Sequence, residues 1–157
     1  MDFDRDSSTG YLVNHAARLL ARQLDVGLAP LGLSTGPFPL LLHLWERDGL
    51  TQKDLVRRLG YEQPTVAATL SRMERDGLVE RRPDPLDGRA QRIWLTKRGH
   101  GLRAAAEAEA QAINERALAG LSPEETRQFV GMIQRIVKSL QDSDKESTRP
   151  AKGRQPS

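Results

Sequence analysis

The residues best suited to chemistry in this 157-residue chain are the arginines of its middle third. Residues 51–98 carry eleven Lys and Arg against seven Asp and Glu, whereas residues 1–50 carry four against six. A guanidinium binds phosphate through a planar fork of N–H donors, so a local excess of arginine is typical of a surface that contacts nucleic acid. A solvated protein surface is the alternative interpretation of the same excess.

The stretch from Gln63 to Asp76 carries a second set of candidate contacts. Val66, Leu70 and Met73 recur in it at helical spacing, which predicts a helix whose apolar face meets a core. The opposite face presents short polar side chains, which reach base edges without holding the helix away from the floor of the major groove. The candidate contacts on this helix are Gln63, Pro64, Thr65, Ala68, Thr69 and Arg72.

Some of these residues have distinct expected partners. Gln63 can read adenine, and Ala68 can contact a thymine methyl group. Arg72 can contact phosphate or guanine, but it also stands four residues before Asp76, at the spacing of a helical ion pair. A plain helix surface is the alternative for every member of the set.

A β-hairpin is predicted directly after this helix. The segments Leu78–Arg82 and Gln91–Leu95 flank a loop rich in Pro, Asp and Gly. Arg89, near the tip, is the residue best placed to enter a DNA minor groove, where negative potential is concentrated. Asp87 can pair with Arg89 and set its direction, although a surface pair alone would add only about 0–1 kcal/mol of stability. The strands add three candidate phosphate contacts, with a solvated strand face as the alternative: Arg81, Arg82 and Arg92.

One enzyme motif is present. Gly32-Leu33-Ser34-Thr35-Gly36 matches G-x-S-x-G, the nucleophile elbow of hydrolases. That elbow needs a buried strand before the serine, whereas a predicted helix and Pro30 come before it here. We therefore expect Ser34 to lie in an interhelical loop, and we do not expect an enzyme.

Metal and thiol chemistry are not expected either. The chain has no Cys, which excludes disulfides, Cys-ligated metals and thiol redox switches. Its three His are scattered and have no carboxylate at ligand spacing, so neither a metal nor another cofactor is predicted.

The elements that must position these residues are mainly helical. Helices are expected over residues 11–29, 37–47, 51–59, 63–76 and 97–119, with a last helix that starts at the capping box of Ser122. The order helix, short helix, turn, helix, hairpin is that of a winged helix-turn-helix, in which Gly60 begins the turn. Its small core is expected to contain Leu50, Leu55, Leu59, Val66, Leu70, Met73, Ile93 and Leu95.

Three stretches of this region resemble the signature of the MarR family of bacterial transcription regulators. They are Asp76-Gly77-Leu78-Val79-Glu80-Arg81, Asp84-Pro85-Leu86-Asp87-Gly88-Arg89, and Leu95-Thr96 with Gly99. With the flanking helices, the resemblance spans about residues 10–141. The chain departs from the family pattern at Gly88, where many members have Arg, and at Ala68, where a basic side chain is common.

The resemblance implies a homodimer whose N- and C-terminal helices interlock and whose two winged lobes bind a palindromic DNA operator. Family members typically repress genes near their own, and many release DNA when a small, often aromatic, ligand binds. The effector pocket would lie between the winged lobe and the dimer helices. The candidate residues there are Tyr11, His15, Arg18, His43 and Trp45, and a structural role is the alternative for both histidines.

The residues themselves also favour a dimer. The last helix carries an apolar stripe that has no obvious place in so small a winged lobe: Phe129, Met132, Ile133, Ile136, Val137 and Leu140. The first helix has a stripe as well, and burial of both against a symmetry mate is the economical arrangement. An additional helical layer within one chain is the alternative.

The predicted organisation has four parts. Residues 1–36 form an N-terminal dimerisation helix and loop, residues 37–98 the DNA-binding domain, and residues 99–141 the C-terminal dimerisation helices. Residues 142–157 have no large apolar residue and are expected to be disordered.

Two further expectations concern location and function. The acidic N-terminus lacks the apolar region of a secretory signal, and the chain has no run of about 18 apolar residues, so we expect a cytoplasmic protein without a membrane contact. A winged-helix module that binds protein and not DNA is the alternative function. It would present an apolar, neutral or acidic face over residues 63–76, and the polar face seen there favours DNA.

Overall fold

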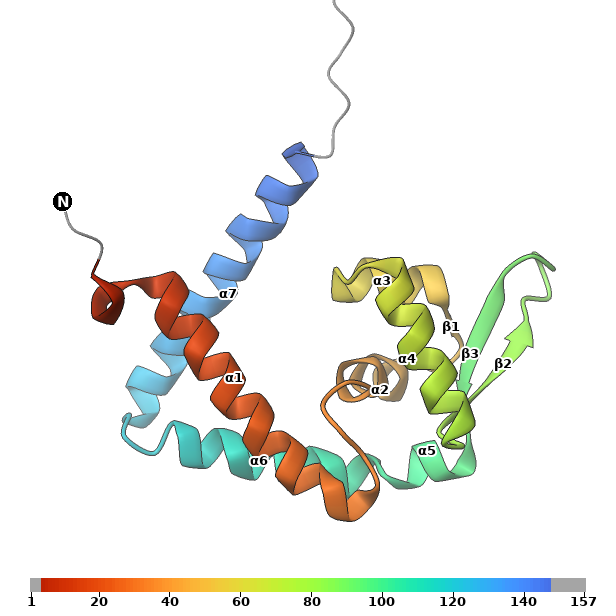
Figure 1. Ribbon diagram of the computed structural model, residues 1–157, viewed down its shortest axis with the longest axis horizontal. Helices are drawn as coiled ribbons and strands as arrows, with labels where there is room; N and C mark the ends of the chain where they lie inside the picture. Colours follow the sequence, from red (N-terminus) through yellow and green to blue (C-terminus); the bar gives the residue numbers. More distant parts are fainter. Residues whose placement is uncertain (1–3, 148–157) are drawn as a thin grey trace, which may run out of the picture. The chain divides into compact units, whose positions relative to one another are not determined.

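The computed structural model describes residues 4–147. The chain divides into two compact units, residues 1–115 and residues 116–157, which we describe separately. Figure 1 gives the labels of the elements. In chain order they are a 3-10 turn Arg5–Ser7, α1 Thr9–Leu28, a 3-10 turn Ala29–Leu31, α2 Phe38–Glu46, β1 Leu50–Thr51, α3 Gln52–Leu59, α4 Gln63–Arg75, β2 Val79–Pro83, β3 Gln91–Leu95, α5 Lys97–Gly101, α6 Arg103–Ala117 and α7 Pro123–Ser147.

The first unit contains the predicted winged helix-turn-helix. Helices α3 and α4 lie next to each other, and the β2–β3 hairpin extends beyond them (Figure 1). The three strands form one antiparallel sheet in the order β1-β3-β2. The hairpin register pairs Val79 with Leu95 and Pro83 with Gln91. The two-residue strand β1 was not predicted, because two residues are too few to show an alternating pattern.

Local signals explain where the helix-turn-helix begins and turns. The hydroxyl of Thr51 accepts the backbone N–H of Asp54 at 3.0 Å, and the Asp54 carboxylate accepts the N–H of Thr51 at 3.1 Å. This capping box was predicted and is confirmed. The backbone N–H of Thr51 holds the pKa of Asp54 below its ordinary value. Gly60 ends α3 with a φ of 65°, a left-handed conformation that glycine adopts without strain.

A single hydrophobic core extends through the first unit. Of the eight residues predicted for the core of the winged lobe, seven are buried and Leu59 is partly buried. The same core includes Leu28 from α1 and Ala106 from α6. The boundaries predicted at residues 36/37 and 98/99 therefore do not separate independent cores.

The predicted helix 97–119 is interrupted. The structure has α5 and α6 in its place, with a break at Leu102. Gly99 and Gly101 lower the helix propensity at this point. Gly99 also lies so close to β2 that an added Cβ would be only 2.2 Å from the carbonyl oxygen of Leu78, so docking on the sheet determines the path of α5.

The second unit consists mainly of α7, in which no residue is buried. This helix continues through residues 142–147, so the predicted disordered tail begins too early. Each added residue extends the backbone hydrogen-bond ladder, and Lys145 pairs with Asp142 one turn earlier at 3.8 Å. Residues 148–157, the rest of that predicted tail, lie outside the described part of the chain. No described helix is both long enough and apolar enough to span a lipid bilayer.

Candidate nucleic-acid interface

The solvent face of α4 carries most of the residues that the sequence singled out. Buried residues of this helix are Val66, Thr69, Leu70 and Met73, which face the core. The exposed candidates are Gln63, Pro64, Thr65, Ala68 and Arg72. Because these side chains are small or flexible, they do not prevent the helix from entering a major groove and approaching the base edges.

Thr69 does not belong to this face, and the prediction was wrong for it. Thr69 is only 4% exposed, because it stands three residues after Val66 and four before Met73, on the same side of the helix. Its hydroxyl donates to the carbonyl oxygen of Thr65 at 2.9 Å and accepts from the Arg72 guanidinium at 3.2 Å. Thr69 therefore orients the Arg72 guanidinium through a hydrogen bond from the buried side of α4.

One alternative predicted for Arg72, an ion pair with Asp76, is not formed. The ion pair of Asp76 is made with Arg75, at 3.2 Å, and not with Arg72. Arg72 lies exposed with its guanidinium on Thr69, a neutral partner, so its positive charge is not compensated by this contact.

Two aspartates shape the loop at the tip of the hairpin. Asp84 accepts the backbone N–H of Leu86 at 2.8 Å, and Asp87 accepts the backbone N–H of Arg89 at 3.0 Å. Each is an Asx-turn, in which a side chain replaces a backbone acceptor. The N–H of Asp84 also donates to the carbonyl oxygen of Ala90 at 2.9 Å, which closes the loop.

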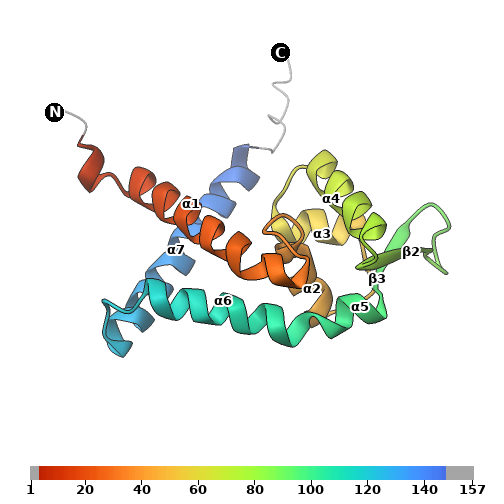
Figure 2. The same cartoon turned by 60° about the horizontal axis from the view of Figure 1, so that its bottom comes forward.

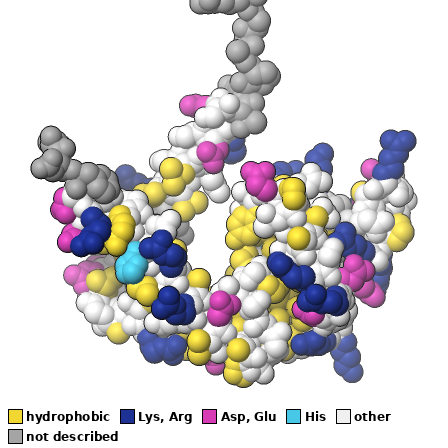
Figure 3. All heavy atoms as spheres, in the orientation of Figure 1, with side chains coloured by type: hydrophobic (Ala, Val, Ile, Leu, Met, Phe, Trp, Pro, Cys, Tyr) yellow, Lys and Arg dark blue, Asp and Glu magenta, His cyan; other side chains and the backbone are white. Residues whose placement is uncertain are grey.

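The predicted side-chain pair between Asp87 and Arg89 is replaced by this backbone contact. Within residues 4–147, the Arg89 guanidinium has no hydrogen bond or ion pair, and the residue is exposed. Asp87 thus sets the direction of Arg89 through the main chain and leaves its guanidinium available. Dark blue, the colour of Lys and Arg, marks the tip of the hairpin at the upper right of Figure 3, and the hairpin itself contains arginines and no lysine.

Arg81 and Arg92 on the strands have internal partners. Arg81 donates to Glu74 at 3.2 Å, Gln52 at 3.4 Å and Ser71 at 3.3 Å, so it joins β2 to α3 and α4. Arg92 donates to the carbonyl oxygen of Gly49 at 2.9 Å and pairs with Asp84 at 2.9 Å.

Arg82 is also engaged within the chain. Its guanidinium pairs with Glu80 and lies 5.5 Å from the centre of the Trp94 ring. The sequence predicted phosphate contacts for all three strand arginines, and the structure shows that each one has contacts with other residues of the hairpin or helices.

The carboxylate of Asp84 is the anchor of the tip. Its side chain is 8% exposed and is held by the Leu86 N–H and by Arg92. The hydrogen bond from the Leu86 N–H holds the pKa of Asp84 below its ordinary value, burial opposes this, and Arg92 adds to the lowering. Asp84 begins one of the stretches that resemble the family signature, but it was not a predicted site residue, because its link to Arg92 across the hairpin depends on a strand register that the sequence did not define.

A groove brings the helix-turn-helix and the hairpin together. It has a volume of about 480 Å³ and is lined by the N-terminal turn of α3, the first residue of α4 and the hairpin loop. Lys53, Gln63 and Arg89 all line it. Lys53 was not among the residues predicted from the sequence. Its position in the first turn of α3, directly after the Thr51 cap, could have indicated a cation at the start of the helix-turn-helix. The groove therefore has cationic and amide donors on both sides, together with the carboxylates of Asp84 and Asp87, and its donors suit the phosphates and base edges of a duplex.

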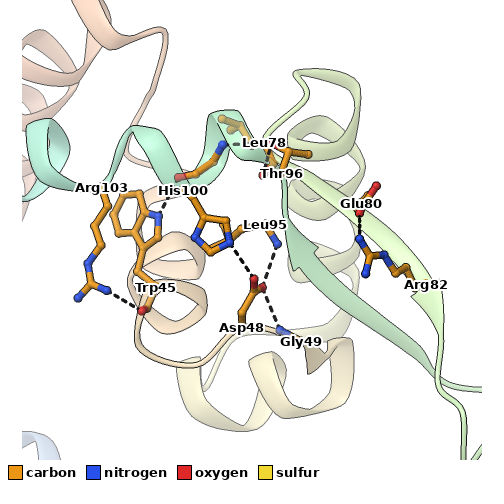
Figure 4. A network of polar contacts seen from close by, with 11 residues as sticks. Trp45, Asp48, Gly49, Leu78, Glu80, Arg82, Leu95, Thr96, His100 and Arg103 are labelled. Atoms are coloured by element: carbon orange, nitrogen blue, oxygen red, sulfur yellow. Dashed lines mark hydrogen bonds and ion pairs between the residues drawn. The ribbon is translucent and has the colours of Figure 1, made fainter.

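A polar network fixes the hairpin to the rest of the unit (Figure 4). Asp48 accepts the backbone N–H groups of Gly49 and Leu95, both at 2.9 Å, and its other oxygen lies 3.1 Å from His100. The Trp45 indole donates to the carbonyl oxygen of Gly99 at 2.9 Å. Trp45 is buried and makes this structural contact, and its place in an effector pocket stays a prediction.

The structure has a cavity of about 430 Å³ between α1, α2 and α6, in the first unit. None of the five predicted effector residues lines it. Tyr11 and His15 stack on each other with ring centres 6.0 Å apart, and Arg18 donates to Asn14 at 2.9 Å on the exposed face of α1. His43, on α2, is half-buried. The lining residues were missed because they come from three helices whose contacts the sequence did not define.

The remaining chemical motif has no catalytic setting. Ser34 is exposed and follows a 3-10 turn, whereas a nucleophile elbow follows a buried strand. Within the described residues 4–147, no three His, Asp or Glu side chains are grouped so that they could hold a metal ion.

The sequence and fold were compared with those of known proteins. The sequence model of the MarR family matches residues 31–90. The chain is 30% identical over 131 residues to the HTH-type transcriptional repressor Rv2887 of Mycobacterium tuberculosis, covering 83% of this chain and 94% of that protein. It is also 30% identical over 105 residues to the transcriptional regulator HosA of Escherichia coli, covering 67% and 78%.

Solved structures agree with this relation. A probable transcriptional regulator from Pseudomonas aeruginosa is 28% identical with a TM-score of 0.78, covering 85% of this chain and 99% of that one. The structure of Rv2887 in complex with DNA is 29% identical with a TM-score of 0.66, covering 83% and 98%.

Proposed function

Since this chain belongs to the MarR family of transcriptional regulators, we propose that it is a repressor that binds a palindromic DNA operator as a homodimer. Helix α4 enters the major groove, and the hairpin tip places Arg89 in the adjacent minor groove. The observation that carries this proposal is the groove shared by Lys53, Gln63 and Arg89, because it joins both reading elements on one face. The relative Rv2887 has been solved in complex with DNA, which supports DNA binding by this chain.

DNA binding is tested by fluorescence anisotropy with the duplex that lies upstream of the coding sequence. We expect the affinity to fall steeply and log-linearly with salt, because bound Lys and Arg release counterions from the phosphates. A random duplex of equal length is the control. Equal affinity for both duplexes, or no salt dependence, would contradict operator recognition.

Dimer formation is supported by the apolar surface of α7. Six large apolar side chains of this helix are 39% exposed or more: Phe129, Val130, Met132, Ile136, Val137 and Leu140. Yellow side chains mark this helix in Figure 3. Monomeric proteins rarely leave such a patch in water, and a two-fold dimer also presents two α4 helices to successive major grooves.

Light scattering after size exclusion tests the dimer. The wild type is expected at twice its mass of 17.5 kDa. Ile136→Glu should shift the protein toward the monomer, and Gln134→Glu on the same helix is the matched control. A monomeric wild type at micromolar concentration would refute the dimer.

Effector control is the remaining part of the proposal. The cavity between α1, α2 and α6 touches α2, which packs on α3 of the DNA-binding part. A ligand that favours one arrangement of these helices shifts the spacing of the two α4 helices and releases DNA. A screen of small aromatic compounds against the protein–operator complex tests this, and a screen without any releasing compound counts against it.

A further inference from the structure

We infer that the cavity between α1, α2 and α6 selects an apolar, aromatic-sized molecule with a hydrogen-bond donor, a protonated amine above all, and discriminates against carboxylates. The effector role of such a molecule rests on the function proposed above, whereas its binding does not. The chemistry of the lining residues supports the inference.

The body of the cavity is apolar. Beside it, α1 lies close to α6 at Gly27, where an added Cβ would lie 2.9 Å from Glu109 and 3.4 Å from Ile113. The apolar lining comes from all three helices and includes Leu20, Leu24, Phe38, Leu42, Ala110 and Ile113. The volume of about 430 Å³ suits a mono- or bicyclic ring system. Figure 2 shows α6 running beside the end of α1.

The polar edge of the cavity comes entirely from α6 and is rich in acceptors. Glu107, Gln111 and Asn114 line it at i, i+4 and i+7, on one face of the helix. One oxygen of Glu107 accepts from Arg103 at 2.9 Å, which leaves the second oxygen for a ligand. Gln111 donates one amide N–H to Glu115 at 2.9 Å, which leaves its carbonyl oxygen as an acceptor and its second N–H as a donor.

The cavity offers no cation to a ligand. Within the described part of the chain, no Lys, Arg or His is among the residues that line it. Arg103 is the nearest candidate in sequence, but it is held by Glu107 and by the carbonyl oxygen of Trp45 at 2.8 Å. A carboxylate in this cavity would lie beside the Glu107 carboxylate with only the neutral amide N–H groups of Gln111 and Asn114 as partners, whereas an ammonium group gains a charge-assisted hydrogen bond.

Calorimetry with three indoles tests the selection, because they share one ring system and differ in the end group. Tryptamine carries an ammonium, tryptophol a hydroxyl and indole-3-acetate a carboxylate. We expect tryptamine to bind about ten-fold more tightly than indole-3-acetate, with tryptophol between them. Glu107→Gln should remove most of the advantage of tryptamine over tryptophol, and Glu46→Gln, on an exposed position of α2, should keep it.

A filling variant locates the binding. Ala21 lines the same cavity, so Ala21→Phe should weaken all three ligands together. Equal or tighter binding of indole-3-acetate, or a preference for tryptamine that survives Glu107→Gln, would overturn the inference, as would the absence of binding by all three. Release of the operator is measured separately: tryptamine that binds without releasing DNA would refute the effector role and leave the selection intact.

Discussion

Arg89 at the tip of the hairpin differs from Arg81 and Arg92 on its strands in what each guanidinium contacts. Arg81 bridges three partners on α3 and α4, and Arg92 links the Gly49 carbonyl to Asp84. The Arg89 guanidinium has no partner within residues 4–147. All four arginines between residues 81 and 92 were predicted to contact DNA, but within residues 4–147 only the Arg89 guanidinium has no partner in the chain.

This contrast separates a supporting region from a reading region. The supporting region comprises the strands, their arginines and the network around Asp48, which hold the hairpin on α4 and α5. The reading region comprises the exposed face of α4 and the hairpin tip. Changes in the first should alter folding stability, and changes in the second should alter DNA affinity.

The largest effect is expected in the supporting region, for Gly99→Ala. An added Cβ would lie 2.2 Å from the Leu78 carbonyl oxygen, so α5 must move off the sheet. We expect a loss of about 3 kcal/mol in the free energy of unfolding, measured by urea denaturation. Gly101→Ala is the control, because nothing lies within 4 Å of its Cβ position. Equal stabilities of the two variants would show that the close approach of Gly99 to Leu78 does not stabilise the supporting region.

The next largest effect is expected in the reading region, for Arg89→Ala. Operator affinity should fall about ten-fold to one-hundred-fold, because a groove contact is lost. The salt dependence should become shallower, and the melting temperature should stay unchanged. Lys97→Ala removes an equal charge outside the groove and is the control. If both variants bind alike, the effect of Arg89 is one of net charge only.

Arg92→Ala should give a smaller change of the opposite kind. Loss of its hydrogen bond to the Gly49 carbonyl is expected to cost about 1 kcal/mol of stability. DNA affinity should fall less than for Arg89→Ala, measured on the same duplex. A larger loss of affinity than for Arg89→Ala would erase the distinction between the two regions.

The smallest effect concerns pH and Asp84. Its pKa is lowered in the folded protein, chiefly by the Leu86 N–H, so its carboxylate stabilises the fold above the ordinary value of about 3.9. This part of the stability is lost as the pH falls through the lowered pKa. Thermal unfolding of the wild type and Asp84→Asn should show a gap at pH 6 that narrows toward pH 3. A gap that stays constant would mean that the charge of Asp84 does not stabilise the tip.

Much of the fold was predictable because its signals are local. The capping box at Thr51, the turn at Gly60 and the hairpin between residues 78 and 95 each depend on a few neighbouring residues. The break at Leu102 was not predictable in this way, because it reflects the docking of Gly99 on Leu78, twenty-one residues earlier and directly before β2. The helix through residues 142–147 was missed because composition alone does not show that an existing helix extends.

The candidate site was predictable in its residue types and less so in their roles. Thr69 was assigned to the wrong face, because a helix face about 100° wide includes i+3 as well as i+4. The partners of Arg81 lie 7, 10 and 29 residues away, beyond the reach of spacing arguments.

The sequence by itself determined the family, the order of the elements and the positions where helices and the hairpin begin, because capping, turn chemistry and periodicity act over a few residues. The tertiary structure alone decided which side chains remain exposed and uncompensated, and which helices enclose the cavity. Those outcomes depend on contacts between segments that are distant in the chain, and neither composition nor spacing records them.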